Sequence, residues 1–183
     1  MPVFFVRGNH ELRGPLARGF LDFAPVPEGG FYYARDHGPL HLIVLDTGED
    51  KPDETNVYAR LNKLKLYREQ EWEWLKMHLA GNARVKSTPF RVILMHQPSW
   101  GWTADQGARW PELANRAGVD LAICGHFHKT SISKAGEFGR NFPVLILGQD
   151  QIAFVEAAAS EIRVTVKALD GTIVQTLTVP ARR

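Results

Sequence analysis

Short apolar runs bounded by turn residues recur along the first two thirds of the chain and predict buried β-strands. The predicted strands cover residues 2–6, 31–35, 40–45, 90–95 and 119–124. His37-Gly38-Pro39 separates the second strand from the third, so these two strands are expected to form a hairpin.

Two other segments show helical periodicity. Between residues 66 and 79, apolar residues recur among charges (Leu66, Trp72, Leu75 and Leu79), and Gly81-Asn82 provides a stop signal. A second helix is predicted at 109–117, where Gly118 ends it. Strands that alternate with helices in this way predict an α/β fold.

Beyond Pro143 the pattern changes to strands alone. The predicted strands cover residues 144–147, 152–157, 162–168 and 173–179, and Asp170-Gly171 is a strong hairpin turn between the last two. No internal repeat or low-complexity linker divides the sequence. We therefore expect one domain over residues 1–183, with an all-strand C-terminal segment from about residue 143.

The composition is typical of a globular protein and argues against several other classes. The chain has 183 residues, of which 44% are hydrophobic and 23% charged, enough for a sizeable core. Its formal net charge of +2 does not indicate a nucleic-acid binder, and no apolar stretch is long enough to span a bilayer. The single Cys124 excludes an intramolecular disulfide and is expected to pack in the core. The sequence does not indicate a compartment.

The chemistry-bearing residues follow the ends of predicted strands. Asn9-His10 follows the run at 2–6, His96 follows the run at 90–95, and His126 follows the run at 119–124. Ligands of open α/β sheets gather at the carboxyl ends of strands. We therefore expect these side chains to converge although they are far apart in the sequence.

His126-Phe127-His128 is the sharpest local feature. Residues two apart in an extended backbone project to the same side, so we expect the two imidazoles to face one site. Each imidazole could then take one metal of a pair, and an amide oxygen such as that of Asn9 is a suitable hard partner. His37, His41 and His78 are expected to be surface or structural residues.

Three ordered motifs carry a family resemblance. Gly8-Asn9-His10-Glu11, Met95-His96 and Gly125-His126-Phe127-His128 resemble the third, fourth and fifth motifs of calcineurin-like metallophosphoesterases. Residues 2–11 and the helix that contains Trp74-Leu75 also resemble bacterial relatives of purple acid phosphatases. The resemblance covers about residues 2–150 and implies a four-layer α-β-β-α sandwich with a site for two metals.

The resemblance also implies residue roles. Asn9, His96 and His126 match ligands of the second metal, and His128 matches a ligand of the first. His10 matches the residue that contacts the phosphate and protonates the leaving oxygen, with Glu11 orienting it. Two transition-metal ions (Fe, Mn or Zn) would activate a water that attacks phosphorus in line. The expected substrate is a small-molecule or nucleotide phosphate ester, because Gly125-His126-Phe127-His128 is absent from the protein phosphatase branch.

Three further residues are expected near the substrate. Arg13 closely follows the Asn-His-Glu motif and is a candidate for contact with the phosphate, and exposure to solvent is an equal alternative. Trp100 and Trp102 follow His96 and are candidates for an aromatic lip over the metals; capping of the core is the alternative.

The first two family motifs, Asp-x-His and Gly-Asp-x-x-Asp, do not occur in the sequence. The fold is therefore expected to be an incomplete four-layer sandwich, truncated at its N-terminus and impaired or inactive as an isolated chain. A complementing N-terminal segment is one expected partner. Two alternatives stay open, a non-catalytic fragment that binds a metal or a partner and a mononuclear metal hydrolase built on three ligands.

Overall fold

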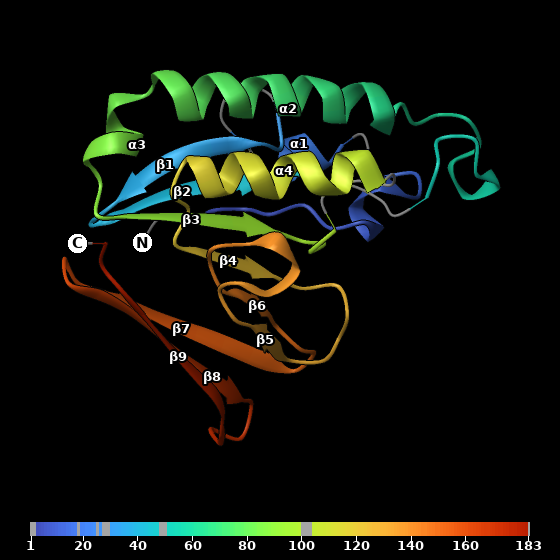
Figure 1. Ribbon diagram of the computed structural model, residues 1–183. Coiled ribbons are helices and arrows are strands. Elements are labelled where there is room, and N and C mark those ends of the chain that lie inside the picture. The colour runs from blue at the N-terminus through green and yellow to red at the C-terminus, as the bar shows by residue number, and fades with distance from the viewer. Residues whose placement is uncertain are drawn as a thin grey trace.

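A computed structural model describes residues 3–17, 19–24, 26, 30–47, 51–99 and 104–182 (Figure 1). Its helices are α1 (Phe20–Phe23), α2 (Leu64–Gly81), α3 (Ala83–Ser87) and α4 (Ala104–Arg116), with the short 3-10 turns η1 (His10–Leu12), η3 (Asn56–Tyr58) and η4 (Glu137–Gly139). Its strands are β1 (Tyr33–His37), β2 (Leu40–Leu45), β3 (Phe90–Met95), β4 (Leu121–Cys124), β5 (Ser131–Ser133), β6 (Val144–Ile146), β7 (Gln151–Ala157), β8 (Glu161–Ala168) and β9 (Ile173–Pro180). None of these helices combines the length and the apolar character that crossing a membrane requires.

A six-stranded mixed sheet forms the middle of the molecule. Its strand order is β1-β2-β3-β4-β6-β5, and β2, β3, β4 and β6 run parallel. Every residue of β2 is buried, which explains why Leu40–Leu45 is continuously apolar apart from His41. Because the central strands are parallel, their carboxyl ends meet at one edge, and the loops that follow β3 and β4 begin there.

Helices α2 and α4 cover one face of this sheet (Figure 1). Trp72, Leu75 and Leu79 of α2 pack with Trp110 of α4 and with Ile93 of β3. The predicted helix at 66–79 is confirmed, and α2 extends beyond it at both ends, from Leu64 to Gly81.

Leu66 is 58% exposed, and the buried positions of α2 are spaced by three and four residues, as one face of an α-helix requires. These positions include Leu64, Arg68, Trp72, Leu75 and Leu79.

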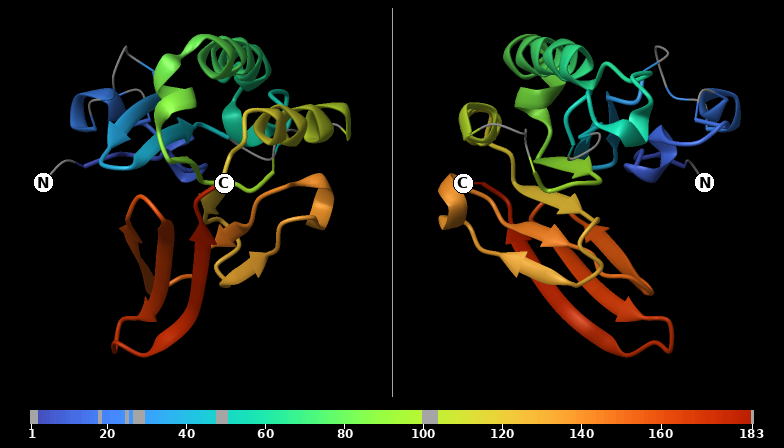
Figure 2. Two further views of the ribbon diagram at one scale, coloured as in Figure 1. Left: turned by 60° about the vertical axis from the view of Figure 1, so that its left-hand side comes forward. Right: turned by 90° about the vertical axis from the view of Figure 1, so that its right-hand side faces the viewer.

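A three-stranded antiparallel sheet, β7-β8-β9, packs on the opposite face (Figure 2). Ile162, Val164 and Val166 alternate along β8 and meet Leu42 of β2 and Val92 of β3. The described residues thus form helix, sheet and sheet layers. The α/β expectation is confirmed, and three layers of the expected sandwich are present in the part of the chain that the structure describes.

Most predicted strands are found within a few residues of their expected bounds, and the hairpin at Asp170-Gly171 is confirmed. There Oδ1 of Asp170 accepts the N–H of Thr172, and Gly171 has a φ of 89°. The predicted strand at 2–6 was wrong over its described residues 3–6, which carry no strand. A β-strand requires a neighbouring strand with which its backbone forms hydrogen bonds. Residues 3–6 instead contribute the side chain of Phe4 to the core between the two sheets.

Candidate metal centre

Three of the predicted ligands meet at the carboxyl edge of the six-stranded sheet. Nε2 of His96 lies 2.9 Å from Oδ1 of Asn9 and 3.3 Å from Nδ1 of His126. The two imidazole rings stand nearly perpendicular, at 84°, with their centroids 5.2 Å apart. The expected convergence of the three chain segments is therefore observed for Asn9, His96 and His126.

The two separations from Nε2 of His96 fit predicted ligand atoms that share one metal ion. Neighbouring ligand atoms bound to one ion at about 2.0–2.2 Å lie about 2.8–3.1 Å apart in octahedral geometry and about 3.3–3.6 Å apart in tetrahedral geometry. The measured separations of 2.9 and 3.3 Å match such edges. No group of three or more His, Cys, Asp or Glu that could hold a metal occurs among the described residues, so a metal bound by the two imidazoles would need the amide oxygen of Asn9 as its third protein donor.

Close packing of backbone against side chains holds the site together. Gly125 donates its N–H to the carbonyl of His96 at 2.8 Å, which links the loops after β3 and β4. A Cβ at Gly8 would lie 2.7 Å from Oε2 of Glu11 and 3.3 Å from His96. Gly8 is therefore needed for the approach of the Asn9 loop to His96.

The backbone around His126 differs from the expectation. His126 and His128 have φ values of 74° and 55°, so His126-Phe127-His128 is a tight loop, and the predicted extended geometry was wrong. Left-handed backbone at non-glycine residues costs about 1 kcal/mol or more each and is concentrated at functional sites. The loop arises because Phe127 donates its N–H to the carbonyl of Gly125 at 3.0 Å, which turns the chain directly after β4.

The remaining predicted site residues have different surroundings. Oε2 of Glu11 accepts the backbone N–H of Gly8 at 2.9 Å and closes the first loop. His10 is exposed on η1, beside the buried Asn9. No contact tests the predicted orienting role of Glu11 toward His10, which stays a prediction.

His128 is exposed, and its carbonyl accepts the N–H of Gln149 at 3.3 Å. Arg13 is half-buried and lines a hollow together with Tyr58 and Asn62. Trp100 and Trp102 lie outside the described residues.

A buried ionic network under the site was not expected from the sequence. The guanidinium of Arg7, directly before Gly8, pairs with the fully buried carboxylate of Asp46, directly after β2. Oγ1 of the next residue, Thr47, accepts the N–H of Gln97 at 2.8 Å, directly after His96. The end of β2 therefore anchors both loops that carry Asn9 and His96.

Glu71 of α2 extends this network. Its Oε1 accepts the N–H of Asp46 at 2.7 Å, and its side chain is removed from water. Burial, and after it the negative charge of Asp46, raises the pKa of Glu71 well above its ordinary value. One signal in the sequence was available for Asp46, because it directly follows the apolar run at 40–45, and functional groups of α/β sheets gather at the carboxyl ends of strands.

The sequence model of the calcineurin-like phosphoesterase family matches residues 1–130. The chain belongs to the calcineurin-like phosphoesterase family. Members of this family are metal-dependent phosphoester hydrolases, and they generally use divalent metals. The matched range contains all four predicted metal ligands together with His10 and Glu11.

Solved structures share the calcineurin-like phosphoesterase fold. The purple acid phosphatase PPD1 from yellow lupin (Lupinus luteus) is similar with a TM-score of 0.58 at 16% identity, over 84% of this chain and 34% of that chain. GAP50, described as the anchor in the inner membrane complex of Plasmodium, has a TM-score of 0.59 at 15% identity, over 85% of this chain and 56% of that chain. No curated protein matches the sequence. The likeness concerns the fold, and the chain spans well under two thirds of each of these relatives.

Proposed function

We propose that this chain carries one metal position and the leaving-group acid of a phosphoester hydrolase that acts on small-molecule phosphate esters. The observation that carries the proposal is the convergence of Asn9, His96 and His126 at distances suited to one cation. Two imidazoles and an amide oxygen form a mixed donor set that suits Zn, Mn or Fe.

Each residue has a role in this proposal. Asn9, His96 and His126 hold the ion, and His10 on the adjoining turn protonates the oxygen of the leaving group. When bound, such an ion acidifies water and neutralises charge on phosphoryl oxygens. His128 contributes to a second metal position, for which a complementing N-terminal segment supplies the remaining ligands.

A second candidate function is a mononuclear hydrolase. It is favoured by a specific observation, because His128 is exposed and has no recorded side-chain contact with Asn9, His96 or His126 among the described residues. Three protein ligands with open positions for water are the usual arrangement of a catalytic metal site.

Metal stoichiometry and turnover test the proposal together. The metal-free chain is loaded with Zn or Mn and analysed by calorimetry and elemental analysis, and then assayed with 4-nitrophenyl phosphate and its diester. We expect one tightly held ion per chain, and His96→Ala should weaken its binding about 100-fold or more. His37→Ala, which changes an exposed histidine at the end of β1, is the matched control and should bind as the parent does.

The assay also separates the candidate functions. Turnover with one ion per chain favours the mononuclear hydrolase, whereas turnover that appears only with a second ion and a complementing segment favours the dinuclear site. If the chain bound no ion, or if His96→Ala bound it unchanged, the proposed function would be wrong.

A further inference from the structure

A separate hollow adjoins the candidate metal centre. It has a volume of about 580 Å³, which lies within the range of about 300–1,000 Å³ that is usual for small-molecule sites. Pro98 and Ser99, which follow His96 by two and three residues, form part of its wall, and Phe127 stands between His126 and His128. The hollow therefore begins at the same two loops that carry the metal ligands.

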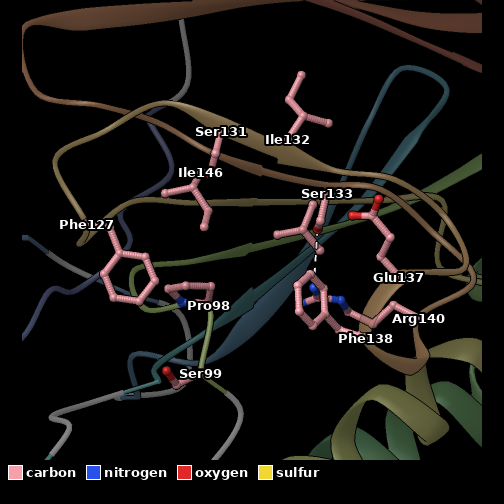
Figure 3. A pocket seen from close by; sticks show the side chains of 11 residues that line it. Pro98, Ser99, Phe127, Ser131, Ile132, Ser133, Glu137, Phe138, Arg140 and Ile146 are labelled. Carbon is pink, nitrogen blue, oxygen red and sulfur yellow. Dashed lines mark hydrogen bonds between the residues drawn. The ribbon is translucent and has the colours of Figure 1, made fainter.

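Two exposed aromatic rings line this hollow. Phe127 is 57% exposed and Phe138 is 80% exposed, although the apolar side chains of Ile132 and Ile146 lie on the same wall. In the view of Figure 3, Phe127 and Pro98 lie at one end of the hollow and Phe138 at the other. A single exposed aromatic ring needs no explanation, but two at one concave apolar surface indicate a binding site for a flat apolar group.

The same wall provides one cation. Nη2 of Arg140 donates to Oγ of Ser133 at 3.2 Å, and the guanidinium carbon lies 5.1 Å from the centroid of the Phe138 ring (Figure 3). Arg140 is half-buried, and this burial lowers the pKa of its guanidinium from its ordinary value. Such a guanidinium gains from an anionic partner that can accept two of its N–H groups.

The neighbouring carboxylate of Glu137 is engaged elsewhere. Glu137 also lines the hollow, and its Oε2 accepts the backbone N–H of Lys134 at 3.1 Å. Against the effect of burial, the charge of Glu137 raises the pKa of Arg140, although no hydrogen bond or ion pair joins the two side chains among the described residues, and Nε of Arg140 has no hydrogen-bond partner. Arg140 therefore keeps donors for a ligand.

We propose that this hollow is a substrate subsite for an aromatic ring that carries a carboxylate. The ring lies against Phe127 and Phe138, the carboxylate pairs with Arg140, and the phosphate ester on the same molecule reaches the ion at His96 and His126. The inference rests on the proposed function and names the organic part of its substrate. Such a subsite favours phosphate esters of carboxyl-bearing aromatic alcohols over simple alkyl phosphates as substrates.

A probe without phosphorus tests the subsite by itself. Binding of 4-fluorobenzoate to the metal-free chain is followed by fluorine NMR line width, and 4-fluorobenzyl alcohol serves as the probe without a carboxylate. We expect a dissociation constant of about 1 mM for the benzoate, as a ligand of this size permits, and binding at least threefold weaker for the alcohol.

Matched variants locate the bound probe. Phe138→Ala and Arg140→Gln should each weaken binding of the benzoate at least fivefold, whereas Phe23→Ala and Arg84→Gln, at exposed positions that do not line the hollow, should leave it unchanged. Because Phe138 is largely exposed, Phe138→Ala should fold as the parent does. This variant therefore still tests the subsite if Arg140→Gln does not fold. The subsite is ruled out if the parent chain does not broaden the fluorine signal of the benzoate. It is also ruled out if Phe138→Ala and Arg140→Gln both bind the benzoate as the parent does.

A second measurement connects the subsite to the substrate. With the metal-loaded chain, 4-carboxybenzylphosphonate should bind at least tenfold more tightly than methylphosphonate, and Phe138→Ala should remove most of this difference. Equal affinities would overturn the assignment of the hollow to substrate. If the benzoate binds and no metal does, the proposed function fails while the hollow remains a binding site.

Discussion

At the scale of single residues, Asn9 is the most informative predicted ligand because it is an amide with only 6% of its surface exposed. A buried amide needs a partner for its oxygen, and here that oxygen faces Nε2 of His96. We expect Asn9→Ala to lower the affinity for zinc about tenfold or more, because it removes one oxygen ligand.

Asn9→Asp is the informative counterpart of that variant, since it keeps an oxygen at the same position. It should bind zinc at least as tightly as the parent chain in a calorimetric titration. If Asn9→Ala bound zinc as the parent does, Asn9 would have a structural role only.

The ion pair between Arg7 and Asp46 leads to a prediction on stability. Removing one partner of a buried ion pair leaves the other charge uncompensated, which typically costs about 3–5 kcal/mol. Asp46→Asn should therefore lower the free energy of unfolding in urea by about 3 kcal/mol. Asp22→Asn, at an exposed position of α1, is the control and should change it by less than about 0.5 kcal/mol.

At the scale of elements, a histidine pair joins β2 to α2 far from the candidate metal centre. Nε2 of His41 lies 2.8 Å from Nε2 of His78, the rings stack at 5.1 Å, and Nδ1 of His41 lies 2.7 Å from a carboxylate oxygen of Asp36. His78 also stacks on Trp74, one turn earlier in α2. Both histidines therefore have a structural role, as the sequence indicated.

This pair makes stability depend on pH. Burial, and then the neighbouring His41, lowers the pKa of His78 from 6.5 to about 4. Between these two values the unfolded chain binds a proton that the folded chain does not, so stability is lost as the pH falls through this window. We expect the free energy of unfolding to decrease by roughly 2 kcal/mol from pH 6.5 to pH 4 through this group.

Chemical unfolding at several pH values, compared between the parent and His78→Gln, measures that contribution. The variant should lose clearly less stability over the same interval. Parallel curves for the two proteins would contradict the assignment to His78.

The elements also show what local patterns can and cannot predict. Strands β3 and β4 were predictable because their apolar runs are buried on both faces of a parallel sheet. Residues 3–6 have a similar composition, but a strand depends on a distant partner, and apolar composition does not encode one. The convergence of His96 and His126 followed from the ends of β3 and β4, whereas Asn9 follows no strand among the described residues and the left-handed backbone at His126 depends on hydrogen bonds within the loop.

At the scale of the whole molecule, two apolar layers hold the three structural layers together. One lies between the helices and the six-stranded sheet, and the other lies between the two sheets. The layer between the two sheets could be predicted only in part. The alternation of apolar and polar residues in β8 shows that one face of this strand is buried, but it does not show which strands cover that face. The hollow at Phe127 was not predictable either, because its wall joins residues from 98 to 146.

If the two sheets form one cooperative unit, a change in the second sheet should affect the helical layer. Ile162 of β8 is fully buried between the sheets. We expect Ile162→Ala to lower the free energy of unfolding by about 2–5 kcal/mol when unfolding is followed by tryptophan fluorescence. All five tryptophans precede the second sheet in the sequence, and Trp72 and Trp110 belong to the other apolar layer.

Ile173→Ala, which changes a residue of the edge strand β9 that is 60% exposed, should shift the transition by less than about 0.5 kcal/mol. A fluorescence transition unchanged by Ile162→Ala would show that the layers unfold independently.

The central claim is that the loops at Asn9, His96 and His126 hold one cation together. X-ray absorption at the zinc edge of the loaded chain counts its imidazole ligands directly. We predict two imidazoles for each zinc ion, with oxygen completing the shell, and one imidazole in His126→Ala. A zinc environment without imidazole scattering, or one that His126→Ala leaves unchanged, would contradict this claim.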